Sequence, residues 1–335
     1  MCALRLLHSR LSPVRTEGIL NMIIKTNHGS TDHVPSGAVV MLGYFDGFHK
    51  GHMALADAAQ KIKQEKNAPC VMLWTFAHLA KGKAITDNEE KAAAFFSYFR
   101  DAYDSADPVV VFEDFSAVSH LTGEEFVKTE LSQRYSASAV VCGFNFRFGK
   151  NGSSGASDLA RYCAEYGIDC CVVPPFELHG KAVSSTELRQ LIESGDVAEA
   201  AQRMGRPYAV TSEVVHGKRL GHSLGFPTVN LRIPQDKVTP AFGVYACRIK
   251  LPSGEIKNGV ANMGSRPTVN RDRKDVTLET YIFDYNGDLY GETITVYLLR
   301  KLRDEVRFGS WEELSAQIEK DKKNAIAFFE KEVFT

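Results

Sequence analysis

The stretch from Ala38 to His52 constrains the fold of this chain more than any other. It begins with an apolar run, Ala38 to Leu42, whose length and composition are typical of a buried parallel strand. From Lys50 onward, apolar residues recur at helical spacing. Between strand and helix, three glycines permit a tight turn and a close approach of the backbone to a ligand: Gly43, Gly47 and Gly51.

His49 and His52 lie three residues apart at the predicted start of this helix, on one side of it. The first backbone N–H groups of a helix are electropositive and suit a phosphate. Two imidazoles there can donate to phosphate oxygens and stabilise the charge that develops during transfer. The structural alternative is that one histidine caps the helix and the other is a surface residue. The strand–glycine–helix context favours the phosphate site.

The composition is that of an ordinary globular protein, with 335 residues, 44% hydrophobic and 24% charged. A net charge of -1 implies no general affinity for polyanions, so nucleic acid is not an expected partner. Seven cysteines without a CxxC pair indicate reduced thiols and a cytoplasmic location. No apolar run approaches the roughly 18 residues of a membrane span, so no membrane association is expected.

The pattern of elements divides the chain into two domains. Residues 1–21 are basic and irregular, and we interpret them as a leader that precedes the folded chain. Strands alternating with helices over 22–203 predict a doubly wound parallel α/β sheet. Strands alone follow over 204–335 and predict a small all-β barrel with a C-terminal helix at residues 310–329.

The expected strands of the sheet are residues 38–42, 70–76, 108–112, 139–143 and 169–173. The expected helices between them cover 87–103, 122–134 and 158–166. The expected barrel strands are residues 208–216, 243–251, 256–263, 276–285 and 293–299.

The string Gly43-Tyr-Phe-Asp-Gly-Phe-His-Lys-Gly-His52 resembles the signature of the HxGH nucleotidyltransferases. It is most similar to the flavin branch, whose pattern reads GxFDGxHxGH. The resemblance implies a reaction at the α-phosphate of ATP with loss of pyrophosphate, in which His49 and His52 are catalytic. The residues then expected to contact nucleotide or phosphate are Gly43, Phe45, Asp46, Gly47 and Gly51.

A second loop, residues 143–155, follows the fourth predicted strand at the same edge of the sheet. Its aromatic rings either pack beneath the sheet or offer flat faces to a ring-shaped ligand, and an embedded arginine can reach a phosphate. The loop resembles G-F-D-F-R-F-G of the flavin adenylyltransferases, which favours the ligand. The expected flavin-binding residues are Asn145, Phe146, Arg147 and Phe148.

The segment Val183-Ser-Ser-Thr-Glu-Leu-Arg189 leads into an apolar helical stripe. Its structural interpretation is a helix N-cap by one of the serines. It also resembles the SSTxIR motif of the same family, which lies against the triphosphate. Hydroxyl and N–H groups at a helix start, with an arginine one turn further on, suit a leaving pyrophosphate. The expected phosphate-binding residues are Ser184, Ser185, Thr186 and Arg189.

Two departures from the family pattern fall on the adenylyl-transfer side. The family usually has TFDPHP after its second strand, where this chain reads Thr75-Phe-Ala-His-Leu-Ala80. Ala77 thus replaces the aspartate, and His78 is a candidate for the missing histidine at a shifted register. Asn145 stands where the family has a second aspartate.

A glycine-rich segment, residues 216–230, opens the second half of the chain. Its glycine N–H groups can wrap phosphates, although the GK[ST] ending of a P-loop is absent. Thr228 and Asn230 point the same way on an extended chain and offer oxygens to Mg²⁺. The structural alternative is a hairpin with a turn-capping threonine. The expected phosphate-binding glycines are Gly217, Gly221 and Gly225.

This segment resembles the riboflavin kinase motif GxxxGRxLGFPTAN, with His222 in place of the usual arginine. The resemblance continues through Leu278-Glu-Thr-Tyr281 and Asp288-Leu-Tyr-Gly291. It implies that Glu279 is the base for the ribityl hydroxyl, whereas a lone glutamate in a strand is most often a solvated surface residue. Phosphoryl transfer agrees with this role, because it needs Mg²⁺ at the triphosphate and a carboxylate to accept the alcohol proton.

Taken together, the motifs resemble those of the bifunctional riboflavin kinases and FMN adenylyltransferases, from Met22 to about Phe334. The resemblance implies phosphorylation of riboflavin by MgATP and then adenylylation of FMN to FAD with release of pyrophosphate. Mg²⁺ is the expected cofactor and ATP the co-substrate. Riboflavin and FMN are the expected partners, together with a weak homo-oligomer.

Two alternatives stay open at this point. In one, the chain is a riboflavin kinase whose N-terminal half has become a flavin-binding or assembly module, as the departures at Ala77 and Asn145 suggest. In the other, it is a cytidylyl- or aminoacyl-transfer relative that acts on lipid precursors or RNA. The absence of a basic stripe argues against RNA, and the kinase motifs argue against both substrates.

Overall fold

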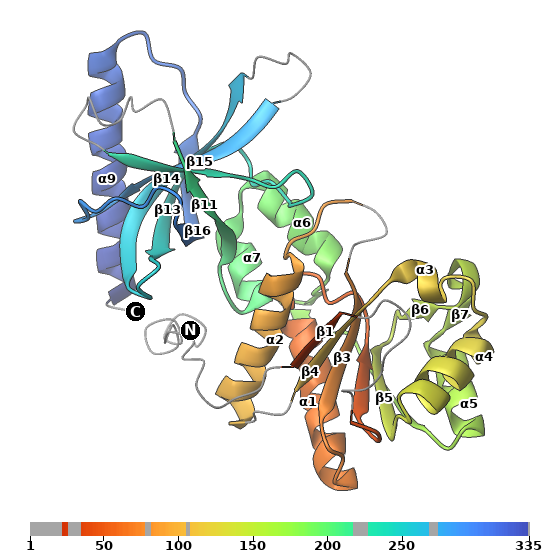
Figure 1. Ribbon diagram of the computed structural model, residues 1–335. Helices are drawn as coiled ribbons and strands as arrows, with labels where there is room; N and C mark the ends of the chain where they lie inside the picture. Colours follow the sequence, from red (N-terminus) through yellow and green to blue (C-terminus); the bar gives the residue numbers. More distant parts are fainter. Residues whose placement is uncertain are drawn as a thin grey trace. The chain divides into compact units, whose positions relative to one another are not determined.

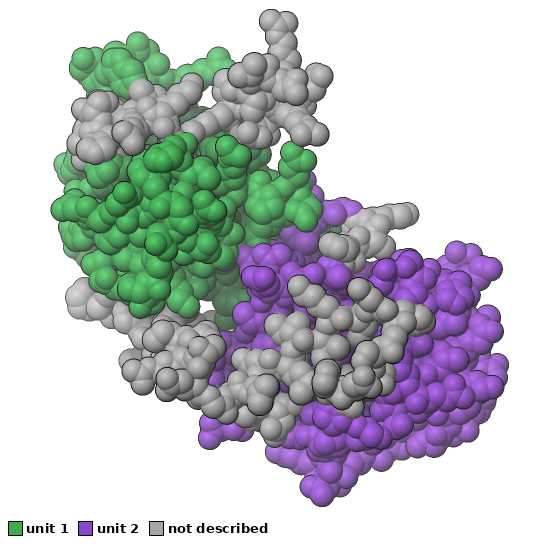
Figure 2. Space-filling model, in the orientation of Figure 1, with its two compact units in different colours: residues 1–14, 186–335 green, residues 15–185 purple. Residues whose placement is uncertain are grey.

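The computed structural model describes residues 22–25, 35–77, 82–104, 108–216, 227–267 and 274–333. Contacts divide the chain into two compact units, with the boundary between Ser185 and Thr186 (Figure 2, purple and green). We call them the N-terminal unit and the C-terminal unit. The predicted leader, residues 1–21, lies outside the described residues.

The N-terminal unit is built on a six-stranded parallel sheet (Figure 1). Across the sheet the strands are β1 (Met22–Lys25), β4 (Val109–Glu113), β3 (Val71–Phe76), β2 (Val39–Leu42), β5 (Ala139–Gly143) and β8 (Asp169–Val173). After β2, the chain places β3 and β4 on one side of it, and then β5 and β8 on the other. The loops after β2 and β5 therefore flank the switch point at which such sheets bind ligands.

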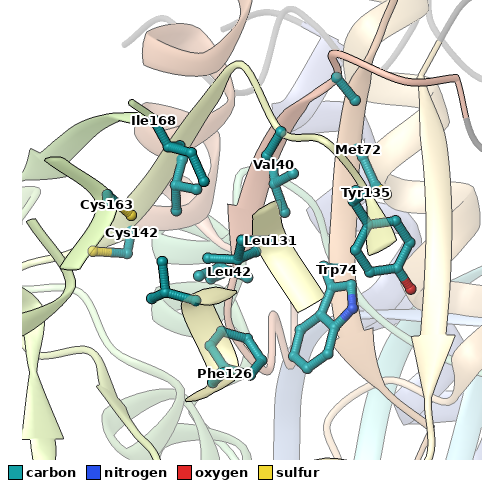
Figure 3. Packing of buried hydrophobic residues seen from close by; sticks show 14 of the residues in the cluster. Val40, Leu42, Met72, Trp74, Phe126, Leu131, Tyr135, Cys142, Cys163 and Ile168 are labelled. Atoms are coloured by element: carbon teal, nitrogen blue, oxygen red, sulfur yellow. The ribbon is translucent and has the colours of Figure 1, made fainter. Parts of the chain in front are cut away.

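Helices cover both faces of this sheet, which confirms the doubly wound prediction. One face packs on α1 (Lys50–Lys66) and α2 (Asn88–Tyr103). The other packs on α4 (Gly123–Phe126), the π-helical segment Val127–Arg134 that continues it, and α5 (Ala156–Glu165). Figure 3 shows this second layer, where Phe126 and Leu131 lie against Leu42 and Trp74. The continuous apolar strands follow from burial on both faces.

Shorter elements complete the N-terminal unit. They are α3 (Phe115–Val118), the hairpin of β6 (Arg147–Phe148) and β7 (Ser154–Gly155), a 3₁₀ turn at Lys150–Gly152, and the hairpin of β9 (Glu177–Leu178) and β10 (Lys181–Ala182). Helix α6 (Ser185–Ser194) begins at the boundary between the units.

The C-terminal unit contains a closed six-stranded antiparallel barrel, which confirms the predicted β-barrel. Around the barrel run β11 (Tyr208–Val215), β12 (Thr228–Arg232), β15 (Lys274–Ile282), β14 (Ile256–Pro267), β13 (Gly243–Lys250) and β16 (Thr293–Asp304). Apolar side chains fill its interior, among them Val210, Cys247, Met263, Leu278 and Val296. The interior of the barrel is therefore a packed apolar core.

Two helices accompany the barrel. Helix α9 (Trp311–Val333) is the predicted C-terminal helix, and it packs Ala325 and Phe329 against the outer wall at Phe283 and Leu299. Helix α7 (Val197–Met204) precedes the first barrel strand and was not predicted. None of the described helices combines the length and apolar composition that a bilayer crossing requires. The described cysteines are all free thiols.

Candidate active sites

The turn after β2 has an unusual backbone conformation. Phe45 and Phe48 have left-handed φ angles of 50° and 32°, and Gly47 between them has a φ of 79°. Such a conformation costs a non-glycine residue about 1–3 kcal/mol. Both phenylalanine rings are buried in the core next to α1 and α2, with at most 1% of their surface exposed. Burial of the rings therefore holds the turn in a shape that an isolated peptide would not keep.

Asp46 ties this turn to the segment before α2. Its carboxylate is 1% exposed, and Oδ1 accepts hydrogen bonds from the N–H groups of Ile85, at 2.9 Å, and Thr86, at 3.1 Å. In return, the N–H of Gly47 donates to the hydroxyl of Thr86 at 3.0 Å. The structure thus places this predicted site residue in the turn, with its carboxylate directed at main-chain donors.

We expect Asp46→Ala to lower the free energy of unfolding of the N-terminal unit by about 1–3 kcal/mol, because it leaves two buried N–H groups without an acceptor. Asp46→Asn keeps an acceptor oxygen and should lose less. Urea unfolding in a Trp311→Phe background would measure this, because the only other tryptophan is Trp74 in the N-terminal unit. Equal urea midpoints for the alanine variant and the parent would contradict a stabilising role of Asp46.

The two histidines lie together at the start of α1. His49 is the N-cap residue, and its N–H donates to Nδ1 of His52 at 3.3 Å. Their rings stack, with centroids 3.6 Å apart and planes inclined by 19°. Because Nδ1 of His52 accepts, its neutral ring carries the proton on Nε2, the tautomer that can donate to a phosphate oxygen. The capping interpretation and the phosphate interpretation are therefore compatible.

Two further contacts shape this site, which we call the histidine site. A Cβ on Gly51 would lie 3.0 Å from the ring of His49, so a side chain there would displace the imidazole. The hydroxyl of Ser185 donates to the carbonyl oxygen of Asp46 at 2.8 Å, which joins the serine motif to the turn. Ser184 immediately precedes α6, and that helix carries Thr186 and Arg189 in its first turns.

The aromatic loop after β5 contains both packed and exposed rings. Phe148 is buried and contacts Phe126 at a centroid distance of 5.7 Å, as the packing interpretation expects, and Phe146 stacks on it at 5.6 Å. Asn145 and Arg147 are exposed, and Nε of Arg147 donates to the carbonyl oxygen of Gly152 at 2.9 Å.

Sequence reasoning missed a second group of rings at this edge. Tyr44, Phe76 and Phe115 follow or end three adjacent strands, with centroid distances of 5.3 Å and 5.1 Å between successive rings. Tyr44 is 37% exposed and Phe115 is 47% exposed. These rings, inclined to one another by 51° and 80°, add an aromatic surface at the same edge of the sheet. Ala77 closes the end of β3 through a main-chain bond to Glu113, whereas His78 lies outside the described residues.

The predicted kinase residues meet on the outer wall of the barrel. Glu279 in β15 lies directly opposite Asn230 of β12 and Asn262 of β14. Opposite residues share a face of the sheet, so these three side chains form a row, which we call the carboxylate row. Thr228 lies opposite Tyr281, the next position on the same face. Asn262 was not predicted, because only the strand register brings it beside the glutamate.

The carboxylate row suits Mg²⁺ bound together with a nucleotide. Thr228 and Asn230 offer neutral oxygens beside a carboxylate, and Mg²⁺ usually completes its coordination with phosphate and water oxygens. Within the described parts of the chain, no cluster of three or more His, Cys, Asp or Glu side chains could hold a metal alone. The predicted phosphate-binding glycines Gly217, Gly221 and Gly225 lie outside the described residues.

The fold and the two sites define a class of protein: an ATP-dependent transferase with one site for nucleotidyl transfer and another for phosphoryl transfer. Family models agree. Residues 31–187 match the model described as FAD synthetase, and residues 204–329 match the model described as riboflavin kinase.

Curated relatives match nearly the whole chain. A bifunctional riboflavin kinase/FMN adenylyltransferase of Escherichia coli is 34% identical over 92% of this chain and 97% of its own length. That of Haemophilus influenzae is 31% identical over 90% and 97%. This chain therefore belongs to the bifunctional riboflavin kinase/FMN adenylyltransferase family.

A solved structure has the same fold. It is described as a macrolide-efflux protein from Streptococcus pneumoniae, and it is 30% identical with a TM-score of 0.77. The match covers 90% of this chain and 98% of that protein.

Proposed function

We propose that this protein phosphorylates riboflavin to FMN and then adenylylates FMN to FAD, using ATP in both steps. One observation carries this proposal: the same chain has stacked histidines at the edge of a parallel sheet and the carboxylate row on a β-barrel. We assign adenylyl transfer to residues 22–203 and phosphorylation to residues 204–335, in the cytoplasm, where ATP is available and thiols stay reduced. The kinase-only alternative is not favoured, because the family relationship covers both halves.

In the kinase step, the carboxylate of Glu279 accepts the proton of the terminal ribityl hydroxyl. The freed oxygen attacks the γ-phosphorus of ATP, the bond to the bridging oxygen breaks, and ADP leaves. Thr228 and Asn230 would hold Mg²⁺, which neutralises triphosphate charge when bound. Asn262, on the other side of the glutamate, can donate from its amide and orient the carboxylate.

In the adenylyl step, a phosphate oxygen of FMN attacks the α-phosphorus of a second ATP, and pyrophosphate leaves. The attacking phosphate is already ionised, so this site requires no base. His49 and His52 supply donors to the oxygens that gain charge. Ser184, Ser185, Thr186 and Arg189 hold the leaving pyrophosphate, and Phe144 with the rings of the aromatic loop offers a surface to the flavin.

Chromatography of riboflavin incubated with the pure protein, Mg²⁺ and ATP tests the proposal. FMN should appear first and then be replaced by FAD, with one pyrophosphate released per FAD. FMN that accumulates without FAD would restore the kinase-only alternative. No flavin product at all would overturn both activities.

A further inference from the structure

Lys91 is a charged residue in the core of the N-terminal unit, with only 3% of its surface exposed. It lies in the first part of α2, after the N-cap Asp87. Its Nζ lies 3.4 Å from the hydroxyl of Thr75 and 3.3 Å from the carbonyl oxygen of Phe76, both at the carboxyl end of β3. The side chain therefore reaches from the helix to the ligand-binding edge of the sheet.

Burial makes this position costly for a charged ammonium group. It lowers the pKa of Lys91 to about 8, although Asp46 opposes this shift and the face of the Phe112 ring, 5.6 Å from Nζ, attracts the cation. The positive end of the α2 dipole also disfavours a cation at this position. A methionine of similar length would avoid these costs, so the contribution of Lys91 to the stability of the fold does not explain it.

The contacts of Lys91 lead to the turn that carries the histidine site. Thr75, whose hydroxyl accepts from Lys91, donates in turn to the carbonyl oxygen of Tyr44 at 3.0 Å. Asp46, the carboxylate that attracts Lys91, lies two residues further along the same turn. Lys91 is therefore linked to the turn at two points, by a hydrogen-bond chain and by charge.

We propose that Lys91 is a positioning residue for adenylyl transfer, which fixes the turn between β2 and α1 and adds positive potential behind the triphosphate site. It is too deeply buried to touch a substrate, so it acts through Thr75, Tyr44 and Asp46. The inference rests on the proposed FMN adenylylation at the histidine site. It adds a residue that no motif in the sequence indicates.

The test compares Lys91→Met and Lys91→Arg with the parent chain in two assays, FAD formation from FMN and FMN formation from riboflavin. Lys91→Met should lower kcat/KM for FAD formation about 100-fold, because a misplaced or uncharged site loses this order of rate. FMN formation at the carboxylate row should stay within about twofold. Lys61→Met, at a side chain that is 77% exposed on α1, is the matched control and should change neither activity.

A pH profile separates charge from packing. Raising the pH from 7 to 9 removes the proton of Lys91, whose pKa is about 8, so FAD formation by the parent chain should fall about tenfold. Lys91→Arg stays charged and should not show this fall. Thr75, Phe76 and Phe112 around the ammonium do not titrate, and the acids of its own helix start, Asp87 and Glu90, bond to each other's main chain.

Urea unfolding followed by Trp74 fluorescence, in the Trp311→Phe background, should give Lys91→Met a midpoint equal to or above that of the parent. Lost FAD formation in that variant then reflects the site and not the fold. Full FAD formation by Lys91→Met, or identical pH profiles for the parent and Lys91→Arg, would overturn the inference. A parent chain that forms FMN but no FAD at any pH would overturn adenylyl transfer itself, and the inference with it.

Discussion

Replacing Glu279 with glutamine is expected to reduce FMN formation from riboflavin by about 10³-fold or more, while FAD formation from supplied FMN continues at the parent rate. The loss follows from the chemistry, because an amide cannot accept the proton of the ribityl hydroxyl, and general-base catalysis contributes about 10²–10⁴-fold. The side chain lies on the outer wall and not in the barrel core, so the shape and stability of the barrel should be unaffected.

Measuring both activities on one preparation makes this result unambiguous, because the second activity reports correct folding and concentration. Glu255→Gln is a suitable control, since Glu255 is an exposed glutamate just before β14 in the same barrel. It should leave FMN formation unchanged. If Glu279→Gln retained FMN formation, the carboxylate row would not be the site of phosphorylation.

Replacing His52 with alanine is expected to have the reverse effect, with FAD formation from FMN reduced about 10²–10³-fold and FMN formation retained. The imidazole supplies a donor on Nε2 and also accepts the N–H of His49 at the helix start. Alanine removes both interactions and the partner on which the ring of His49 stacks. A small loss of stability, about 1 kcal/mol, should accompany the loss of the cap.

The control for this variant is His120→Ala, at an exposed histidine in the same unit. It should change neither activity. Steady-state rates at saturating FMN and ATP would show whether the loss lies in kcat, as expected for charge stabilisation in the transition state. If His52→Ala removed both activities equally, the model of two independent sites would be wrong.

The sequence was sufficient to predict the strands that are buried on both faces. β2, β3, β4 and β5 have continuous apolar residues because helices cover the sheet on each side, whereas the edge strand β8 was predicted from its apolar residues although it is largely exposed. β1 has only four residues, too few for an argument from periodicity, and it was not predicted. The sequence predicts no separate strand at β12, because its five residues follow a glycine-rich segment that resembles a phosphate-binding loop.

The site was predictable where its residues are contiguous in the chain. His49 and His52 meet because both belong to one helix start, and Thr228 and Asn230 share a face because they are two apart on a strand. Asn262 could not be found in this way, since the register of β14 against β15 decides its neighbours.

Sequence patterns also do not predict the direction in which a side chain points. Asp46 lies within a string of expected nucleotide contacts, yet its carboxylate is directed to main-chain N–H groups some 39 residues away in sequence. Lys91 appears in the sequence as an ordinary polar residue of an amphipathic helix, and only the helix–sheet packing places it in the core. Long-range hydrogen bonds of this kind depend on the tertiary arrangement.

The pairing of β1 with β4 has a consequence for folding during synthesis on the ribosome. Paired residues of the two strands, such as Met22 and Val109, are 87 positions apart, so β1 leaves the ribosome roughly 4–17 s before its partner at about 5–20 residues per second. β2 likewise waits for β5 on one of its sides. Until β4 is made, the apolar strand β1 has no partner strand in the nascent chain and exposes an unpaired edge that favours aggregation.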